Sequence, residues 1–125
     1  MKITYKIDKK RKIVTETWPE KVTIEDYKDV KLREFSDPDF STEYDVITDI
    51  RNVNMEFNEN LIEQIVVFMK KNSDKMKNRK SAIVADSPQN VAKSLFFGQK
   101  ARNLNVKISV FSSPDAALKW IKENW

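Results

Sequence analysis

The segment 81–85, Ser-Ala-Ile-Val-Ala, consists entirely of small or apolar residues, and it constrains the fold more than any other feature. A strand with no strongly polar side chain on either side has to be covered on both faces, as the strands of parallel sheets are. Ser87 and Pro88 follow it, and this pair favours a helix start because serine caps free N–H groups and proline suits the first helical position. The segment therefore predicts a buried strand followed by a helix.

The rest of the chain alternates between strand-like and helix-like patterns. Apolar and polar residues alternate at both ends of the chain, which predicts half-buried strands, and apolar residues at helical spacing predict helices between them. We expect strands over 3–7, 13–18, 44–50, 81–85 and 106–110, and helices that begin near Thr23, at Asn58 or Asn60, at Ser87 and at Ser113.

The resulting order is β-β-α-β-α-β-α-β-α, a hairpin followed by three strand–helix units. Such an order predicts an α/β fold with a mostly parallel five-stranded sheet in sequential strand order. The chain has 125 residues without a linker or a low-complexity segment, so we expect one domain over 1–125.

The composition excludes several kinds of catalytic site. The chain has no histidine, no cysteine and a single glycine. It therefore cannot form a Ser-His-Asp or Cys-His centre, a thiol nucleophile or a zinc site that uses His or Cys. One glycine is also too few for a Walker A loop or a G-x-G-x-x-G turn. We expect no metal, no cofactor and no enzymatic activity.

The charge and the hydropathy pattern favour a cytoplasmic protein without a membrane span. The net charge is +4, and the densest basic runs are 9–12 and 75–80, which we interpret as solvated turns. The basic runs therefore do not indicate a nucleic-acid-binding role. The N-terminus has no apolar signal region, and every apolar stretch is too short to cross a bilayer.

Three segments resemble the SpoIIAA-like (STAS-type) family, which includes bacterial anti-sigma-factor antagonists, and most closely its uncharacterised single-domain members. These segments are 44–53 (YDVITDIRNV), 81–88 (SAIVADSP) and 110–121 (VFSSPDAALKWI). The resemblance covers nearly the whole chain in order. It implies a sheet of order 1-2-3-4-5 with the first strand antiparallel and with helices wound along the sheet.

The family's phosphorylation switch is not matched by this sequence. In the antagonists, a phosphorylatable serine follows the third strand at the start of the next helix. Here the corresponding stretch, residues 53–60 (VNMEFNEN), contains neither serine nor threonine. The expected protein is therefore a STAS-like module without the serine switch.

Polar residues follow the third and fourth predicted strands, where α/β proteins commonly place their ligands. A small polar or anionic ligand would meet helix N-termini and loops at this edge. The alternative is purely local structure, with a turn and a salt bridge at Asp49 and a helix cap at Ser87. The candidate ligand-binding residues are Asp49, Arg51, Asn52, Asn54, Asp86 and Ser87.

Phe96 and Phe97 precede Gly98, the only glycine, which interrupts the helix predicted after the fourth strand and ending near Asn103. Gly98 favours either a break in this helix or close packing against a neighbour. Neighbouring residues on a helix point in different directions, so the two rings cannot share one core stripe. One ring is therefore a candidate for a pocket or a subunit interface, and the alternative is that both are buried.

These observations favour a non-catalytic module of bacterial regulation that binds a protein partner or a small ligand. An apolar ligand and a homodimeric assembly are both compatible with them. Two other classes stay open. One is an enzyme that uses carboxylates such as Asp49 and Asp86, and the other is a weak nucleic-acid binder that uses the basic runs.

Overall fold

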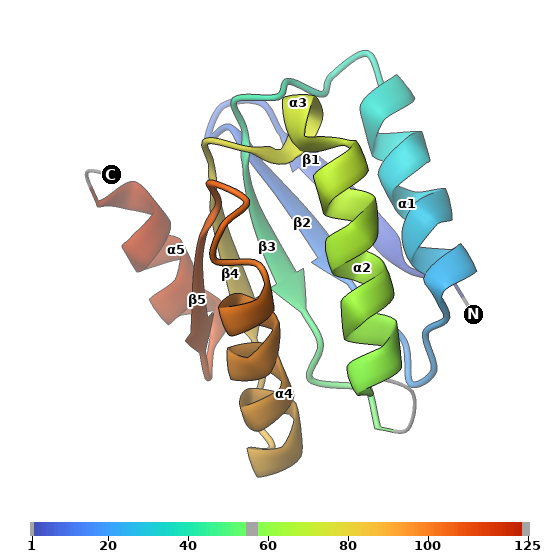
Figure 1. Ribbon diagram of the computed structural model, residues 1–125. Coiled ribbons are helices and arrows are strands. Elements are labelled where there is room, and N and C mark those ends of the chain that lie inside the picture. The colour runs from blue at the N-terminus through green and yellow to red at the C-terminus, as the bar shows by residue number, and fades with distance from the viewer. Residues whose placement is uncertain (1, 55–57, 124–125) are drawn as a thin grey trace.

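The computed structural model describes residues 2–54 and 58–123, and it shows one five-stranded sheet of order β1-β2-β3-β4-β5. β1 and β2 are antiparallel, and every later pair of neighbours is parallel (Figure 1). The predicted fold class and strand order are thus confirmed. The strands are β1 (Thr4–Asp8), β2 (Ile13–Thr17), β3 (Asp45–Asp49), β4 (Lys80–Val84) and β5 (Lys107–Phe111).

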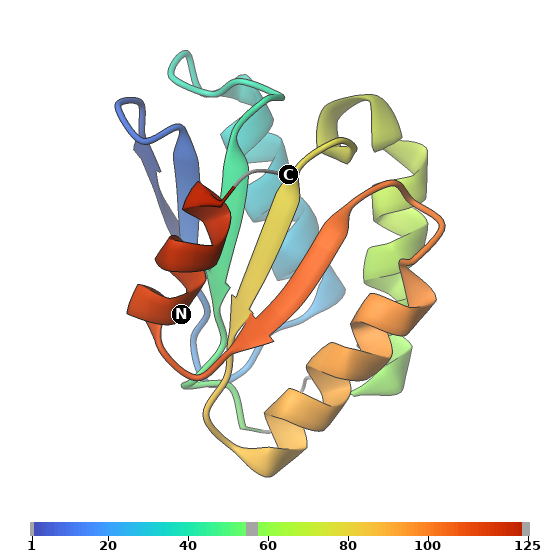
Figure 2. The same cartoon turned by 90° about the vertical axis from the view of Figure 1, so that its left-hand side faces the viewer.

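The helices form a layer on each face of this sheet. α1, α2 and α4 lie on one face, and α5 lies alone on the other (Figures 1 and 2). A short helix, α3, which the sequence patterns did not predict, leads from α2 toward β4. The bounds are α1 (Ile24–Ser36), α2 (Glu59–Lys71), α3 (Ser73–Met76), α4 (Pro88–Lys100) and α5 (Pro114–Lys122).

β4 is buried on both sides, as its composition predicts. Ala82 and Val84 pack on the α5 side in a small cluster with Ala117 and Ile121. Ile83 belongs to the larger core under α1, α2 and α4. Because successive strand residues point to opposite faces, each core takes alternate residues of the same strand.

Side-chain caps fix where the helices begin. Thr23 accepts a hydrogen bond from the Asp26 amide, and the Asp26 carboxylate accepts one from the Thr23 amide, which completes a capping box. Asn58, rather than Asn60, caps α2, while Ser87 and Ser113 cap α4 and α5.

The prediction that Gly98 interrupts its helix is wrong. α4 continues through Gly98 and ends at Lys100, with Ala101 as C-cap. A Cβ atom at Gly98 would meet the Ile108 side chain at 3.8 Å, an ordinary contact, so the helix packs on β5 without strain there. A single glycine lowers helix propensity by only about 1 kcal/mol, which tertiary packing offsets.

The interpretation of the second basic run as a solvated turn is wrong at its last two residues. Arg79 and Lys80 are each 3% exposed. Arg79 precedes β4 and Lys80 is its first residue, so their side chains extend to opposite faces of the sheet. The first run, 9–12, is an exposed turn except for its contacts with acidic neighbours.

Candidate ligand-binding cavity

The polar residues after β3 form a compact turn. Asp49 accepts hydrogen bonds from the Arg51 backbone amide at 3.1 Å and from the Arg51 guanidinium at 3.0 and 2.7 Å. Partial burial acts against ionisation of Asp49, yet these bonds hold the pKa of its carboxyl below the ordinary value. The hydrogen bonds that the Arg51 guanidinium donates to Asp49 likewise raise the pKa of Arg51. The two side chains thus bind each other.

The other predicted site residues have local partners or lie at the surface. Ser87 accepts from the Asn90 amide, and Asn54 donates to Glu20 at 2.8 Å. Asn52 and Asp86 are exposed near this turn. The structure brings Asp49 and Arg51 together without gathering the whole set around a shared hollow. Residues 55–57, which follow Asn54 in the sequence, lie outside the described residues.

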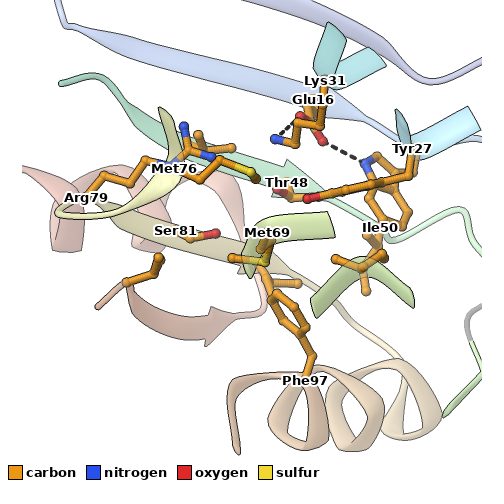
Figure 3. A pocket seen from close by; sticks show the side chains of 15 residues that line it. Glu16, Tyr27, Lys31, Thr48, Ile50, Met69, Met76, Arg79, Ser81 and Phe97 are labelled. Atoms are coloured by element: carbon orange, nitrogen blue, oxygen red, sulfur yellow. Dashed lines mark hydrogen bonds and ion pairs between the residues drawn. The ribbon is translucent and has the colours of Figure 1, made fainter. Parts of the chain in front are cut away.

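A cavity of about 40 Å³ lies elsewhere, between the sheet and the layer of α1, α2 and α4 (Figure 3). Its floor follows the strand register, with Glu16 beside Thr48 and Thr48 beside Ile83. The space corresponds to roughly three water-sized groups. Its lining residues are Glu16, Trp18, Tyr27, Lys31, Val46, Thr48, Ile50, Ile65, Met69, Met76, Arg79, Ser81, Ile83, Phe97 and Val106.

This lining is mostly apolar, with charged groups on two sides. Figure 3 shows Arg79 reaching inward from the start of β4, with Lys31 and Glu16 on another side and Phe97 coming from α4. Phe97 is thus the member of the aromatic pair that faces the cavity. Phe96 is half-buried, with the Lys100 ammonium 5.3 Å from its ring centre.

A buried ion pair holds α1 against β2. Lys31 Nζ lies 2.6 Å from Glu16 Oε2, and the Trp18 indole N–H donates to Glu16 Oε1 at 3.0 Å. Burial opposes ionisation of Glu16, but the charge of Lys31 and hydrogen bonds from its neighbours lower its pKa to about 2. Burial also acts against a charged Lys31, and the nearby carboxyl groups more than compensate, so its pKa is raised. Both groups are therefore ionised at neutral pH.

Glu34 is a neutral member of the same cluster. Its side chain is fully buried, lies 3.4 Å from Lys31 and is hydrogen-bonded to the Glu16 carboxyl. Burial, followed by the negative charge of Glu16, raises the pKa of Glu34 to about 9. Two carboxyl groups this close share one proton, and Glu34 carries it.

Arg79 is the charged group that this cluster leaves unbalanced. Its Nε and Nη1 atoms are fully buried and have no hydrogen-bond partner among the described residues. Burial lowers the pKa of the guanidinium, but arginine stays protonated in proteins. Glu16 and Lys31 cancel each other and Glu34 is neutral, so the lining carries one excess positive charge at Arg79.

The backbone around Arg79 is firmly held. Asn78 and Asn105 adopt left-handed conformations with φ of 62° and 57°, which asparagine tolerates better than most residues. The Asn78 amide donates to the Asn105 carbonyl at 2.8 Å, and the Lys107 amide donates to the Arg79 carbonyl at 3.0 Å. The guanidinium is therefore presented to the cavity from a fixed position.

Lys80 shows how a neighbouring buried cation is satisfied. Its Nζ donates to the carbonyl groups of Trp120 at 2.8 Å and Glu123 at 2.6 Å, where α5 ends. The last carbonyl groups of a helix have no partner within the helix and favour a cation. Lys80 thus caps α5, whereas Nε and Nη1 of Arg79 have no such acceptors among the described residues.

Sequence reasoning missed this site, although the sequence carries a signal for it. Glu16 lies between Val14 and Trp18 on the inward side of its strand, and Lys31 and Glu34 follow Tyr27 at helical spacing. Charged residues at apolar positions of a strand and of a helix that pack together indicate a buried pair.

Comparison with protein-family models, with curated proteins and with solved structures finds no match to this chain. Within residues 2–54 and 58–123 no group of acidic residues is arranged to hold a metal ion. Across the same described part of the chain, no helix combines the length and apolar character needed to cross a bilayer. The cavity geometry therefore carries the functional argument.

Substitution of the two adjacent buried cations by methionine separates their roles. We expect Lys80→Met to lower the free energy of unfolding by about 1.5–3 kcal/mol, because it removes charge-assisted bonds to the α5 terminus. Arg79→Met should leave stability unchanged or raise it, because it removes a buried charge that no described residue pairs. Urea denaturation of both variants measures the difference. Equal losses in the two variants would show that Arg79 is satisfied within the protein.

Substitutions within the ion cluster test the protonation of Glu34. At pH 7, Lys31→Met should lower the free energy of unfolding by about 3–5 kcal/mol, because it leaves the buried Glu16 carboxylate without its partner. Glu34→Gln keeps a neutral group of similar shape in the folded protein and removes a carboxyl that ionises in the unfolded chain at pH 7, so it should raise the free energy of unfolding.

The same variants differ in their pH dependence. The Glu34 pKa rises from 4.5 in the unfolded chain to about 9, so the stability that Glu34 contributes is full below pH 4.5 and is lost as the pH rises through 9. The wild-type free energy of unfolding should fall over that interval, and Glu34→Gln should remove this part of the slope. An unchanged slope in Glu34→Gln would place the proton elsewhere.

Proposed function

We propose that this protein is a non-catalytic, STAS-like module that binds a small molecule in the cavity beneath α1, α2 and α4. The proposal depends on the side chain of Arg79, which is buried and lines this cavity. Its Nε and Nη1 atoms have no hydrogen-bond partner among the described residues. Buried polar groups in proteins are nearly always hydrogen-bonded, so a ligand with acceptor atoms fits this space.

Binding rather than catalysis suits the remaining groups of the site. Lys31 and Glu16 neutralise each other at 2.6 Å, and Trp18 takes the second oxygen of Glu16. These groups are occupied in holding α1 to the sheet, and proton transfer to a ligand would have to break the pair. The sheet order and the antiparallel first strand agree with the resemblance to the SpoIIAA-like family, which includes non-enzymatic modules.

The size of the cavity sets the size of the ligand. A volume of about 40 Å³ fits a molecule of roughly three or four non-hydrogen atoms. Met69 and Met76 line the space, and their unbranched side chains can shift to admit a somewhat larger molecule. Because affinity is limited to about 1.5 kcal/mol per ligand atom, dissociation constants near the millimolar range are expected for the smallest ligands.

Methyl NMR tests this proposal with acetate, acetamide and acetone, which have the same size and shape. At least one of them should shift the methyl signals of Ile50, Ile65 and Ile83, which line the cavity, and the shift should saturate. Val46→Ile adds a methylene group at the cavity floor and should abolish this response. Val67→Ile, at an exposed position on α2, is the matched control and should bind as the wild type does.

Two results would overturn the proposal. One is the absence of a saturable shift with all three probes. The other is unchanged binding in Val46→Ile, provided that its methyl spectrum without ligand and its thermal unfolding show a folded protein.

A further inference from the structure

The charge balance of the cavity identifies the class of its ligand. The lining holds Arg79 and the ion pair of Glu16 and Lys31, and the neutral Glu34 lies behind this pair, 3.4 Å from Lys31. Water in the cavity can satisfy the N–H groups of Arg79, but it cannot balance the charge of the guanidinium. An anion does both, and a carboxylate matches the donor geometry of a guanidinium particularly well.

The apolar part of the lining narrows the choice further. Ile50, Ile65 and Ile83 also line the space, and their side chains offer no hydrogen-bond donors. Phosphate or sulfate would place further oxygen atoms against these groups at a large desolvation cost. A carboxylate with a short apolar tail meets Arg79 with one end and the isoleucine side chains with the other.

Glu34 is the second group that can balance the charge of Arg79. An ionised Glu34 would place a second negative charge beside Glu16, and the cations that would offset it are Lys31, at 3.4 Å, and then Arg79. A bound anion and an ionised Glu34 therefore compete for the same cation. The groups that surround Glu34 are Glu16 of β2, Lys31 and Tyr27 of α1, Arg79 before β4, and Tyr5 of β1.

We propose that the ligand is a small carboxylate that binds at Arg79 and whose binding requires a proton on Glu34. This inference rests on the proposed function, since it assigns the ligand class and the pH response of the same cavity. By linkage, the anion and the proton strengthen each other's binding. The protein would thus report the concentration of a short-chain acid only while Glu34 is protonated.

The test compares acetate with acetamide by methyl NMR at pH 7 and pH 10, at constant ionic strength set with sodium chloride. At pH 7, acetate should bind about tenfold or more tightly than acetamide, because charge-assisted hydrogen bonds exceed neutral ones. Arg79→Met should remove this preference. Arg79→Lys keeps the charge and should retain part of it.

The change of pH then tests the role of Glu34. At pH 10 about a tenth of the molecules keep the proton on Glu34, so the apparent dissociation constant for acetate should rise about tenfold. Acetate itself stays ionised over this range, so the ligand does not contribute to the change. Glu34→Gln should bind acetate at pH 7 and should lose the pH dependence.

The outcomes separate this inference from the proposed function. Equal affinity for acetate and acetamide, or an acetate preference that survives in Arg79→Met, would overturn the carboxylate assignment and leave a neutral-ligand cavity. Acetate binding that is unchanged at pH 10 would overturn the link to Glu34. A cavity that takes none of the probes would overturn the proposed function itself.

Discussion

The ion pair between Glu16 and Lys31 joins the sheet to α1, and the charge arrangement of the interior depends on it. Its 2.6 Å contact keeps Glu16 ionised in the core. An ionised Glu16 in turn forces Glu34, its close neighbour, to keep a proton. Glu16 is thus paired and Glu34 is neutral, so neither carboxyl group of the cluster balances Arg79. The charge of Asp45 also acts on Arg79, but Nε and Nη1 of Arg79 have no hydrogen-bond partner among the described residues. A single contact between β2 and α1 thereby creates a cavity with an excess positive charge.

Arg79 and Lys80 show how strand geometry gives adjacent residues different roles. Both are 3% exposed, and they extend to opposite faces of the sheet. Lys80 reaches the carbonyl groups at the end of α5 and stabilises that helix on its face. Arg79 reaches a cavity whose carboxyl groups are already paired or protonated. The difference between a structural cation and a candidate binding group lies in the acceptors that each face provides.

Sequence patterns predicted the framework better than the site. Apolar runs, alternation and serine caps act locally, so β4, the hairpin and the starts of α4 and α5 followed directly from them. The predicted helix break at Gly98 is wrong because packing of α4 on β5 outweighs the small loss of helix propensity at a single glycine. Arg79 and Lys80 were interpreted as solvated because a run of basic residues usually is. Their surroundings include β5 and the end of α5, which are distant in sequence from both residues.

The most direct measurement is the titration of the Glu34 and Glu16 side chains by carboxyl ¹³C NMR. Glu34 should remain protonated at pH 7 and titrate near pH 9, while Glu16 stays ionised down to about pH 2. A Glu34 carboxyl that is already ionised at pH 7 would contradict the central claim. In that case Glu34 itself would balance Arg79, and the cavity would have no excess charge for an anion to neutralise.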